Sequence, residues 1–262
     1  MKPLRLWQVD AFASRPFAGN PAAVVALDHA LDDATMQAIA AENNLSETAF
    51  ITPAGRDYAI RWFTPTQEVN LCGHATLASA YVVFEHLEPT RERVSFASKS
   101  GPLHVTLDHA TERLTLDFPE YPCERVPFED AVTAAVGLRP AEVWQGTKLM
   151  AVFENEAQVR ALTPDFTKVA ALPAFGLIVT APGSDCDFVS RYFVPQAGVN
   201  EDPVTGSAHC QLTPYWARRL GRPTLFARQV SKRGGELWVT HAAPRVWIAG
   251  HATEYMSGSI EI

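Results

Sequence analysis

Two short stretches of the chain, Arg61-Trp62-Phe63-Thr64-Pro65 and Arg191-Tyr192-Phe193-Val194-Pro195, decide the fold, because the second repeats the first 130 residues later. The likeness continues to Val69-Asn70 and Val199-Asn200, so that five of ten aligned positions hold the same residue. Internal similarity at a nearly constant offset is typical of a duplicated structural unit. We therefore predict two halves of like fold.

The repeat extends beyond these stretches with few insertions. After the inserted Glu201-Asp202-Pro203, the segment Leu71-Cys72-Gly73-His74-Ala75 pairs with Val204-Thr205-Gly206-Ser207-Ala208. At the same offset, Ser98-Lys99-Ser100-Gly101 recurs as Ser231-Lys232-Arg233-Gly234. The matches keep their chain order and the offset only grows, which scattered chance matches would not do.

Each half is predicted to be a set of strands around one helix. Alternating apolar residues indicate strands at 5–12, 103–108 and 114–118, and apolar residues at helical spacing indicate helices at 75–87, 207–220 and 32–43. Arg218, Arg219 and Gly221 form a good C-terminal signal for the helix at 207–220. Pro214 lies inside that helix, where a kink or a late start is expected.

These elements predict an α+β fold of two pseudo-symmetric half-domains, each a mostly antiparallel sheet wrapped around a central helix. We place the N-terminal half-domain at 1–118 and the C-terminal half-domain at 128–262, joined by a proline-rich linker at 119–127. The sequence leaves the path of residues 254–262 undecided: this segment can stay with the second half or return to pair with the first half. The expected active site is the cleft between the halves.

Composition narrows the classes of function. The chain has 262 residues, of which 47% are hydrophobic and 19% charged, as in ordinary globular proteins. Twenty-two basic and 29 acidic residues give a net charge of −7, which disfavours a nucleic-acid partner. No apolar run approaches the ~18 residues of a membrane span, and residues 1–10 are too polar for a signal peptide. We expect a cytoplasmic protein that contacts no membrane.

The four cysteines argue for free thiols. They are widely scattered and form no CxxC pair, which disfavours both a zinc site and a disulfide framework; they are Cys72, Cys123, Cys186 and Cys210. The chain also lacks the glycine-rich patterns that bind nucleotide phosphates. We therefore expect no metal ion and no nucleotide cofactor.

Gly73 and Gly206 stand at equivalent helix starts in the two halves. Glycine permits close approach of a ligand, and the unpaired N–H groups of a first helical turn attract anions. The implied ligand is a small carboxylic acid. Alternatively, the two glycines only serve tight turns between a strand and a helix.

The polar residues around these glycines differ between the halves, which favours function over structure. His74 stands in one half and Ser207 in the other, and Asp202 belongs to an insertion of the second half. The positive helix end predicts a neutral His74. Each residue also has a structural reading: a helix-capping histidine, a first-turn serine and a turn aspartate.

Glu47 is the candidate acid or base. It begins a predicted strand, and the loosely aligned stretch of the second half, 175–180, has no acid. A carboxylate at a strand start is more often simply solvated. A Cys72 nucleophile paired with His74 is the weaker alternative, because side chains two residues apart at a helix start do not generally face each other.

Five motifs, taken in this order, are specific. They are Asp10-Ala11-Phe12, Pro16-Phe17-Ala18-Gly19-Asn20-Pro21-Ala22-Ala23-Val24, Asn44-Leu45-Ser46-Glu47-Thr48, Leu71-Cys72-Gly73-His74-Ala75-Thr76 and Glu201-Asp202-Pro203-Val204-Thr205-Gly206-Ser207-Ala208-His209. Together they resemble the PhzF-like phenazine-biosynthesis isomerases, whose fold is related to diaminopimelate epimerase. The resemblance covers nearly the whole chain.

The resemblance implies that the residue matching Glu47 is the general acid/base. It also implies that residues matching His74, Asp202 and Ser207, with the glycines matching Gly73 and Gly206, bind the substrate without a metal or an organic cofactor. The epimerase relatives use two cysteines, and no symmetric cysteine pair can be placed here. A homodimer is also implied.

The leading hypothesis is a cofactor-independent isomerase that moves a proton between carbons of a small carboxylate-bearing substrate. The alternative is a non-catalytic small-acid binding protein on the same scaffold. Neither the substrate nor the pathway follows from the sequence, and phenazine synthesis in particular does not follow.

Overall fold

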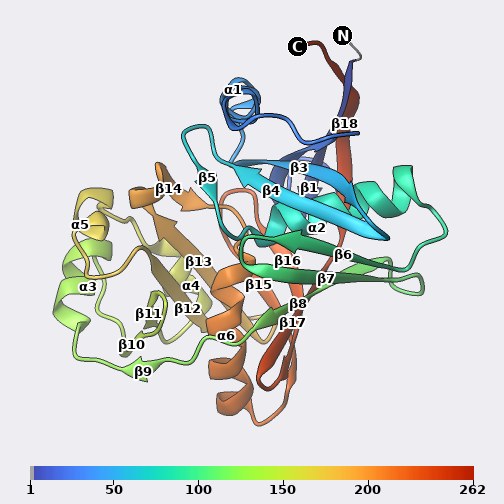
Figure 1. The fold of residues 1–262 in the computed structure, drawn as a ribbon. Helices are drawn as coiled ribbons and strands as arrows, with labels where there is room; N and C mark the ends of the chain where they lie inside the picture. The colour runs from blue at the N-terminus through green and yellow to red at the C-terminus, as the bar shows by residue number, and fades with distance from the viewer. Residues whose placement is uncertain (1–2) are drawn as a thin grey trace. The chain divides into compact units, whose positions relative to one another are not determined.

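The computed structural model describes residues 3–262, which form two compact units (Figure 1). The first unit runs through Asp117 and adds the C-terminal stretch Ala249–Ile262, and the second unit is Phe118–Ile248. The sequence analysis assigned 128–262 to the C-terminal half-domain and left open that its last residues, 254–262, return to pair with the first half. In the structure the end of that range belongs to the first unit, because its last strand pairs with the first strand of the chain.

The first unit is built on one mixed sheet with the strand order β18–β1–β2–β3–β4–β6–β7–β8, and β5 lies beside β4. The pairs β2–β3 and β4–β6 are parallel and the others are antiparallel. The strands are β1 Leu4–Ala11, β2 Asn20–Ala26, β3 Glu47–Ala54, β4 Asp57–Phe63, β5 Glu68–Val69, β6 Arg93–Ser98, β7 Gly101–Asp108, β8 Arg113–Pro119 and β18 Ala252–Ile260.

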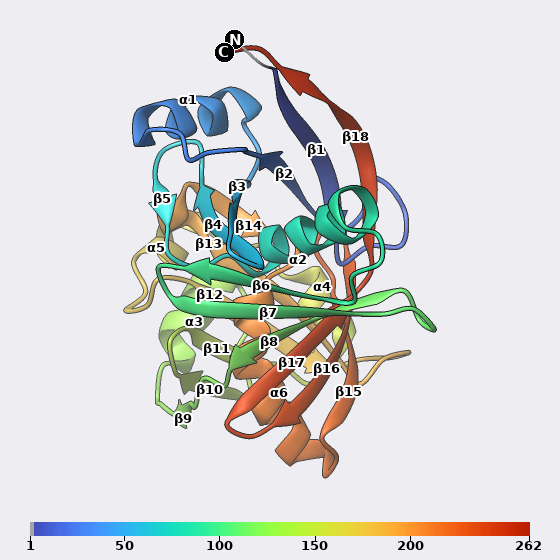
Figure 2. The same cartoon turned by 45° about the vertical axis from the view of Figure 1, so that its right-hand side comes forward.

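Two helices cover opposite faces of the first sheet (Figure 2). Helix α1 (Asp33–Asn43) packs with Ala23 and Val25 of β2 in one apolar cluster. Because strand side chains alternate, Ala22 and Val24 face the other way, toward helix α2 (Gly73–Val82). All residues of α2 except Tyr81 are buried. This burial makes α2 the central helix of the unit.

The second unit repeats this pairing scheme. Its strand order is β9–β10–β11–β12–β13–β15–β16, with β14 beside β13 and with the parallel pairs β11–β12 and β13–β15. The strands are β9 Glu124–Arg125, β10 Glu142–Gln145, β11 Leu149–Val152, β12 Leu177–Pro182, β13 Phe188–Val194, β14 Val199–Asp202, β15 Thr224–Gln229, β16 Gly235–Ala242 and β17 Arg245–Gly250. Three helices, α3 (Glu129–Val136), α4 (Glu156–Ala161) and α5 (Phe166–Ala170), pack on one apolar cluster with β12 and β13.

Helix α6 (Gly206–Leu220) is the counterpart of α2 and keeps Pro214 within a single helix. Proline cannot donate a hydrogen bond to the carbonyl four residues earlier. The carbonyl of Cys210 instead accepts a hydrogen bond of 2.9 Å from the backbone N–H of Tyr121. The helix ends on Gly221, which has a φ of 68°, as its terminal pattern predicted.

The predicted elements are present with shifted ends. Both central helices begin at the glycine itself, and α2 gives way at Val83 to a π-helical turn, η1 (Val83–Leu87), inside the predicted helix 75–87. A change of helix type within a continuous apolar pattern leaves no signal in residue spacing. None of the helices in the described residues is long and apolar enough to cross a membrane.

Candidate active site

The first unit brings two of the predicted residues together. Glu47 is the first residue of β3 and His74 is the second residue of α2. His74 Nε2 lies 3.1 Å from Glu47 Oε2, and the two side chains are 6% and 18% exposed. The two atoms are in close contact, but their angle is not that of a hydrogen bond, and neither atom has another hydrogen-bond partner among the described residues.

Two residues that the sequence analysis did not assign to the site face the opposite ring nitrogen. Asn20 Nδ2 lies 3.1 Å and Cys72 Sγ 3.5 Å from His74 Nδ1. Asn20 is fully buried at the start of β2 and follows Gly19, where a Cβ atom would lie only 2.2 Å from the carbonyl oxygen of Ala11. An amide has both a donor and an acceptor end, so Asn20 can pair with either protonation state of Nδ1. The Gly19-Asn20 pair in the family motif was the available signal.

The electrostatics of this cluster differ from the sequence-based expectation. Burial lowers the pKa of His74, but the close contacts with Cys72 and the Glu47 carboxylate raise this pKa well above its usual value. This shift is opposite in direction to the one expected for a neutral His74. The field of the helix N-terminus is outweighed by a carboxylate in direct contact, because Coulomb energy rises steeply at short distance.

The expected separation of Cys72 from His74 is also wrong. Cys72 precedes the helix with extended backbone angles (φ −142°, ψ 116°), so helical spacing does not govern its side chain. The contact does not make the thiol reactive, since burial and then the charge of Glu47 raise the pKa of Cys72 to about 11. All four cysteines are free, as predicted.

The same three residues form a set that could hold a metal ion. One ligand atom from each of Glu47, Cys72 and His74 lies within 4.8 Å of the others. Thiolate, imidazole and carboxylate are ligands that zinc accepts. The sequence argument against a zinc site considered only the spacing of cysteines. It did not consider ligands that a strand and a helix distant in sequence bring together in the fold.

In the second unit the predicted residues surround the start of α6. Asp202 ends β14, and its Oδ2 accepts a hydrogen bond of 2.5 Å from the Thr205 hydroxyl. The Gln229 amide accepts a hydrogen bond from Thr205 N at 2.9 Å and donates one to Asp202 O at 2.8 Å. Ser207 is half-buried in the first turn of α6, after the buried Gly206. Hydrogen bonds from the buried side-chain amide of Gln229 thus fix the conformation of the loop that contains Asp202.

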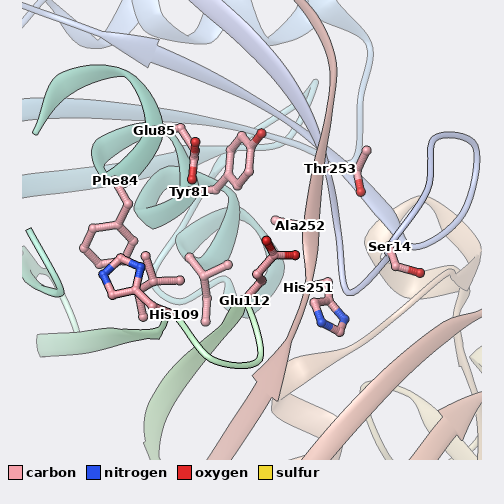
Figure 3. Close-up of a pocket in the computed structure, with 11 residues that line it drawn as sticks. Ser14, Tyr81, Phe84, Glu85, His109, Glu112, His251, Ala252 and Thr253 are labelled. Carbon is pink, nitrogen blue, oxygen red and sulfur yellow. The ribbon is translucent and has the colours of Figure 1, made fainter. Parts of the chain in front are cut away.

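A separate pocket of about 380 Å³ opens within the first unit (Figure 3). Tyr81 and Glu85 line it from the end of the central helix, Glu112 from the turn between β7 and β8, and Thr253 from β18. No residue predicted for the site belongs to its lining. The pocket is therefore distinct from the Glu47–His74 cluster.

Comparisons with known proteins agree with this architecture. Residues 9–258 match the family model described as phenazine biosynthesis-like protein. An uncharacterized isomerase of Pseudomonas aeruginosa is 54% identical over 99% of this chain and 99% of its own. A crystal structure of a PhzF-family phenazine biosynthesis protein from Enterococcus faecalis covers 100% of both chains with 47% identity and a TM-score of 0.97.

A more distant structure shows the extent of the fold. A hydroxyproline epimerase from Agrobacterium vitis, with bound trans-4-hydroxy-L-proline, is 13% identical, with a TM-score of 0.63 over 98% of this chain and 92% of its own. The predicted diaminopimelate epimerase-like α+β fold is confirmed. The isomerase names of the full-length relatives also support the predicted enzyme class. The chain belongs to the phenazine biosynthesis-like family of isomerases.

Proposed function

We propose that this isomerase moves a proton between two carbons of a small carboxylate-bearing substrate, with Glu47 as the general acid/base. The observation that carries the proposal is the 3.1 Å contact between Glu47 Oε2 and His74 Nε2 in a nearly buried setting. One carboxylate can accept a proton from one carbon and return it to another. The relatives named isomerases and epimerases fit this reaction class.

The proposed reaction needs no atoms beyond the substrate and Glu47. The Glu47 carboxylate takes a proton from a substrate carbon, and the electron pair of that C–H bond moves into the adjoining unsaturated system. The protonated Glu47, which is 18% exposed and can exchange its proton with solvent, then donates a proton to a different carbon and regains its carboxylate. The substrate formula is unchanged.

His74 is proposed to stabilise the charged intermediate. The contacts around His74 raise the pKa of its ring, and in this proposal a protonated ring beside Glu47 favours an anion formed on the substrate. We further propose that Gly73, and Asp202, Gly206 and Ser207 of the second unit, bind the substrate. Backbone N–H groups at helix starts favour carboxylates, which supports the choice of a small acid.

The test is deuterium uptake at carbon from D₂O, followed by NMR over a panel of small amino, hydroxy and unsaturated carboxylic acids. Wild type should incorporate deuterium into at least one compound. Glu47→Gln should lose about 10²- to 10⁴-fold in exchange rate while still binding that compound. The control is Glu42→Gln, which removes an exposed carboxylate from α1 of the same unit.

Near-normal exchange in Glu47→Gln would remove Glu47 from its proposed role. If calorimetry shows binding of a compound and wild type exchanges none of the panel, the protein is a small-acid binder rather than a proton-transfer enzyme for these acids.

A further inference from the structure

Lys148 lies in the second unit, in the turn between β10 and β11. Its backbone is hydrogen-bonded to α6, the central helix of that unit. The fully buried Gln211 of α6 donates from Nε2 to Lys148 O at 3.0 Å and accepts from Lys148 N at 3.3 Å. Gly146 makes this approach feasible, because a Cβ atom there would lie 2.7 Å from Gln211 Oε1 and 2.8 Å from Pro122 O. These hydrogen bonds and the close packing at Gly146 therefore fix the backbone position of Lys148.

The Lys148 ammonium is held between two aromatic rings. Its Nζ lies 5.8 Å from the centre of the Tyr121 ring and 5.6 Å from that of Tyr192. Tyr121 is anchored through its N–H to the Cys210 carbonyl that Pro214 leaves available. Rings at this distance attract a cation but leave its charge uncompensated.

Within residues 3–262, no carboxylate forms an ion pair with that ammonium, although the charge of Asp202 acts on it. Among the described residues, Lys148 takes part in no ion pair, whereas Lys99 pairs with Glu68 and Lys168 pairs with Asp165. Burial lowers the pKa of Lys148, and the charges of Cys210 and Asp202 act in the opposite direction. A partly desolvated cation without an ion-pair partner in direct contact is costly, and such groups are typical of ligand sites.

The strand register places this ammonium beside the proposed substrate-binding loop. Tyr192 of β13 is the direct strand partner of Asp202 of β14, and its ring contacts Lys148. Asp202 is hydrogen-bonded to the Thr205 hydroxyl. The Asp202 carboxylate is therefore hydrogen-bonded within its loop, and the Lys148 ammonium lies on the same side of the sheet, against the ring of its strand partner Tyr192.

We propose that Lys148 binds a second acidic group of the substrate, so that the enzyme acts on small dicarboxylates in preference to monocarboxylates. This inference rests on the proposed function, which requires only one carboxylate. Lys148 is a specificity-determining residue in this proposal, and Tyr121 and Tyr192 hold its ammonium in place.

The test compares muconate with sorbate, two six-carbon dienoic acids that differ in their number of carboxylates. Calorimetry should show that wild type binds muconate at least about tenfold more tightly than sorbate. Lys148→Met should weaken muconate binding by about ten- to a hundredfold, the range for a lost charge-assisted hydrogen bond, and leave sorbate unchanged. Lys148→Arg should keep most of the preference.

Lys168→Met is the matched control, because Lys168 is a solvent-exposed lysine of the same unit. It should bind both acids as wild type does. The ¹³Cε NMR signal of Lys148 should also shift with millimolar muconate. An unmoved Lys148 signal, or equal muconate binding by wild type and Lys148→Met, overturns the proposal.

Glu47→Gln separates this proposal from the proposed function. That variant should keep the preference for muconate, since Glu47 acts on a carbon-bound proton and not on the second carboxylate. Full exchange activity in Glu47→Gln would end the proposed role of Glu47 without affecting Lys148. Loss of the muconate preference only in Lys148→Met would support Lys148 whatever the fate of Glu47.

Discussion

The starts of α2 and α6 share a backbone design but present different chemistry. Each helix follows an extended residue, Cys72 or Thr205, with φ of −142° and −120°. In each, the residue four positions on contacts the carbonyl of that extended residue: Thr76 Oγ1 donates to Cys72 O, and His209 Nδ1 lies 2.8 Å from Thr205 O. The duplicated frame has been kept while its side chains diverged.

The divergence separates two tasks. The α2 end carries the coupled His74 and Glu47, groups suited to proton transfer. At the α6 end the Thr205 hydroxyl donates to the Asp202 carboxylate, and the Gln229 amide bonds the backbone of both residues, an arrangement suited to holding a ligand. If this comparison is right, substitutions at the first end reduce turnover and substitutions at the second end raise KM.

The largest expected effect is on kcat, and it should distinguish Glu47 from Asp202. Glu47→Gln should lower kcat by about 10²- to 10⁴-fold because it removes the proton carrier. Asp202→Asn should change kcat by less than about tenfold, since Asp202 is proposed to bind and not to transfer protons. Steady-state kinetics on the substrate found by deuterium uptake will measure both. Equal losses of kcat in the two variants would contradict the assignment of proton transfer to the start of α2 and ligand binding to the start of α6.

The next largest effect is on the free energy of unfolding, and it arises from His209 of α6. Burial lowers the pKa of His209 to about 4, whereas an unfolded histidine titrates near 6.5. The unfolded chain therefore binds more protons between these values. The contribution of His209 is fully present above about pH 6.5 and is lost as pH falls toward about 4, by about 3 kcal/mol.

Urea unfolding at pH 7 and pH 4.5 checks this prediction. His209→Gln should show a smaller loss of unfolding free energy between the two pH values than wild type. His109→Gln, which changes an exposed histidine of the first unit, should retain the full loss. The same pH dependence in wild type and His209→Gln would contradict the prediction.

A smaller effect is expected at the loop before α6. Thr205→Val should raise KM by about tenfold, because the Asp202 carboxylate loses the hydroxyl that orients it. Thr76→Val removes a buried hydroxyl from α2 and serves as the control, with little change in KM. Initial-rate kinetics distinguish the two, and a larger KM change in Thr76→Val would count against the binding role of the α6 loop.

Cys72→Ala should have little effect on the reaction. The thiol stays protonated at neutral pH because its pKa is about 11, so we expect kcat within about threefold of wild type. Deuterium-uptake rates are the measure. A loss as large as that in Glu47→Gln would restore the thiol as a participant.

The smallest expected effect is that of a chelator. Removing divalent ions with EDTA should leave the exchange rate unchanged, because the proposed reaction uses only the protonation of Glu47 and His74. Added Zn²⁺ should inhibit wild type more than Cys72→Ala, since Cys72 completes the three-ligand set. Activity lost with EDTA and restored by a metal would make this set a metal site.

Most of the fold was predictable because it depends on local patterns and on the repeat. Apolar periodicity located the strands and both central helices, and the terminal Arg218, Arg219 and Gly221 marked the end of α6. The misses came from irregular backbone. The π-helical turn after Val82 and the uninterrupted helix at Pro214 both depend on hydrogen bonds that spacing does not encode.

The sequence by itself determined the duplication, the two glycine-led helices and the candidates Glu47 and His74, because residue identity and order carry that information. The tertiary structure was needed to show that Asn20 and Cys72 flank His74, that the pKa of this histidine is raised and not lowered, and that Lys148 forms no ion pair among residues 3–262. These properties arise from contacts between distant segments and from burial, which change the free energy of a charge by amounts that no local motif records.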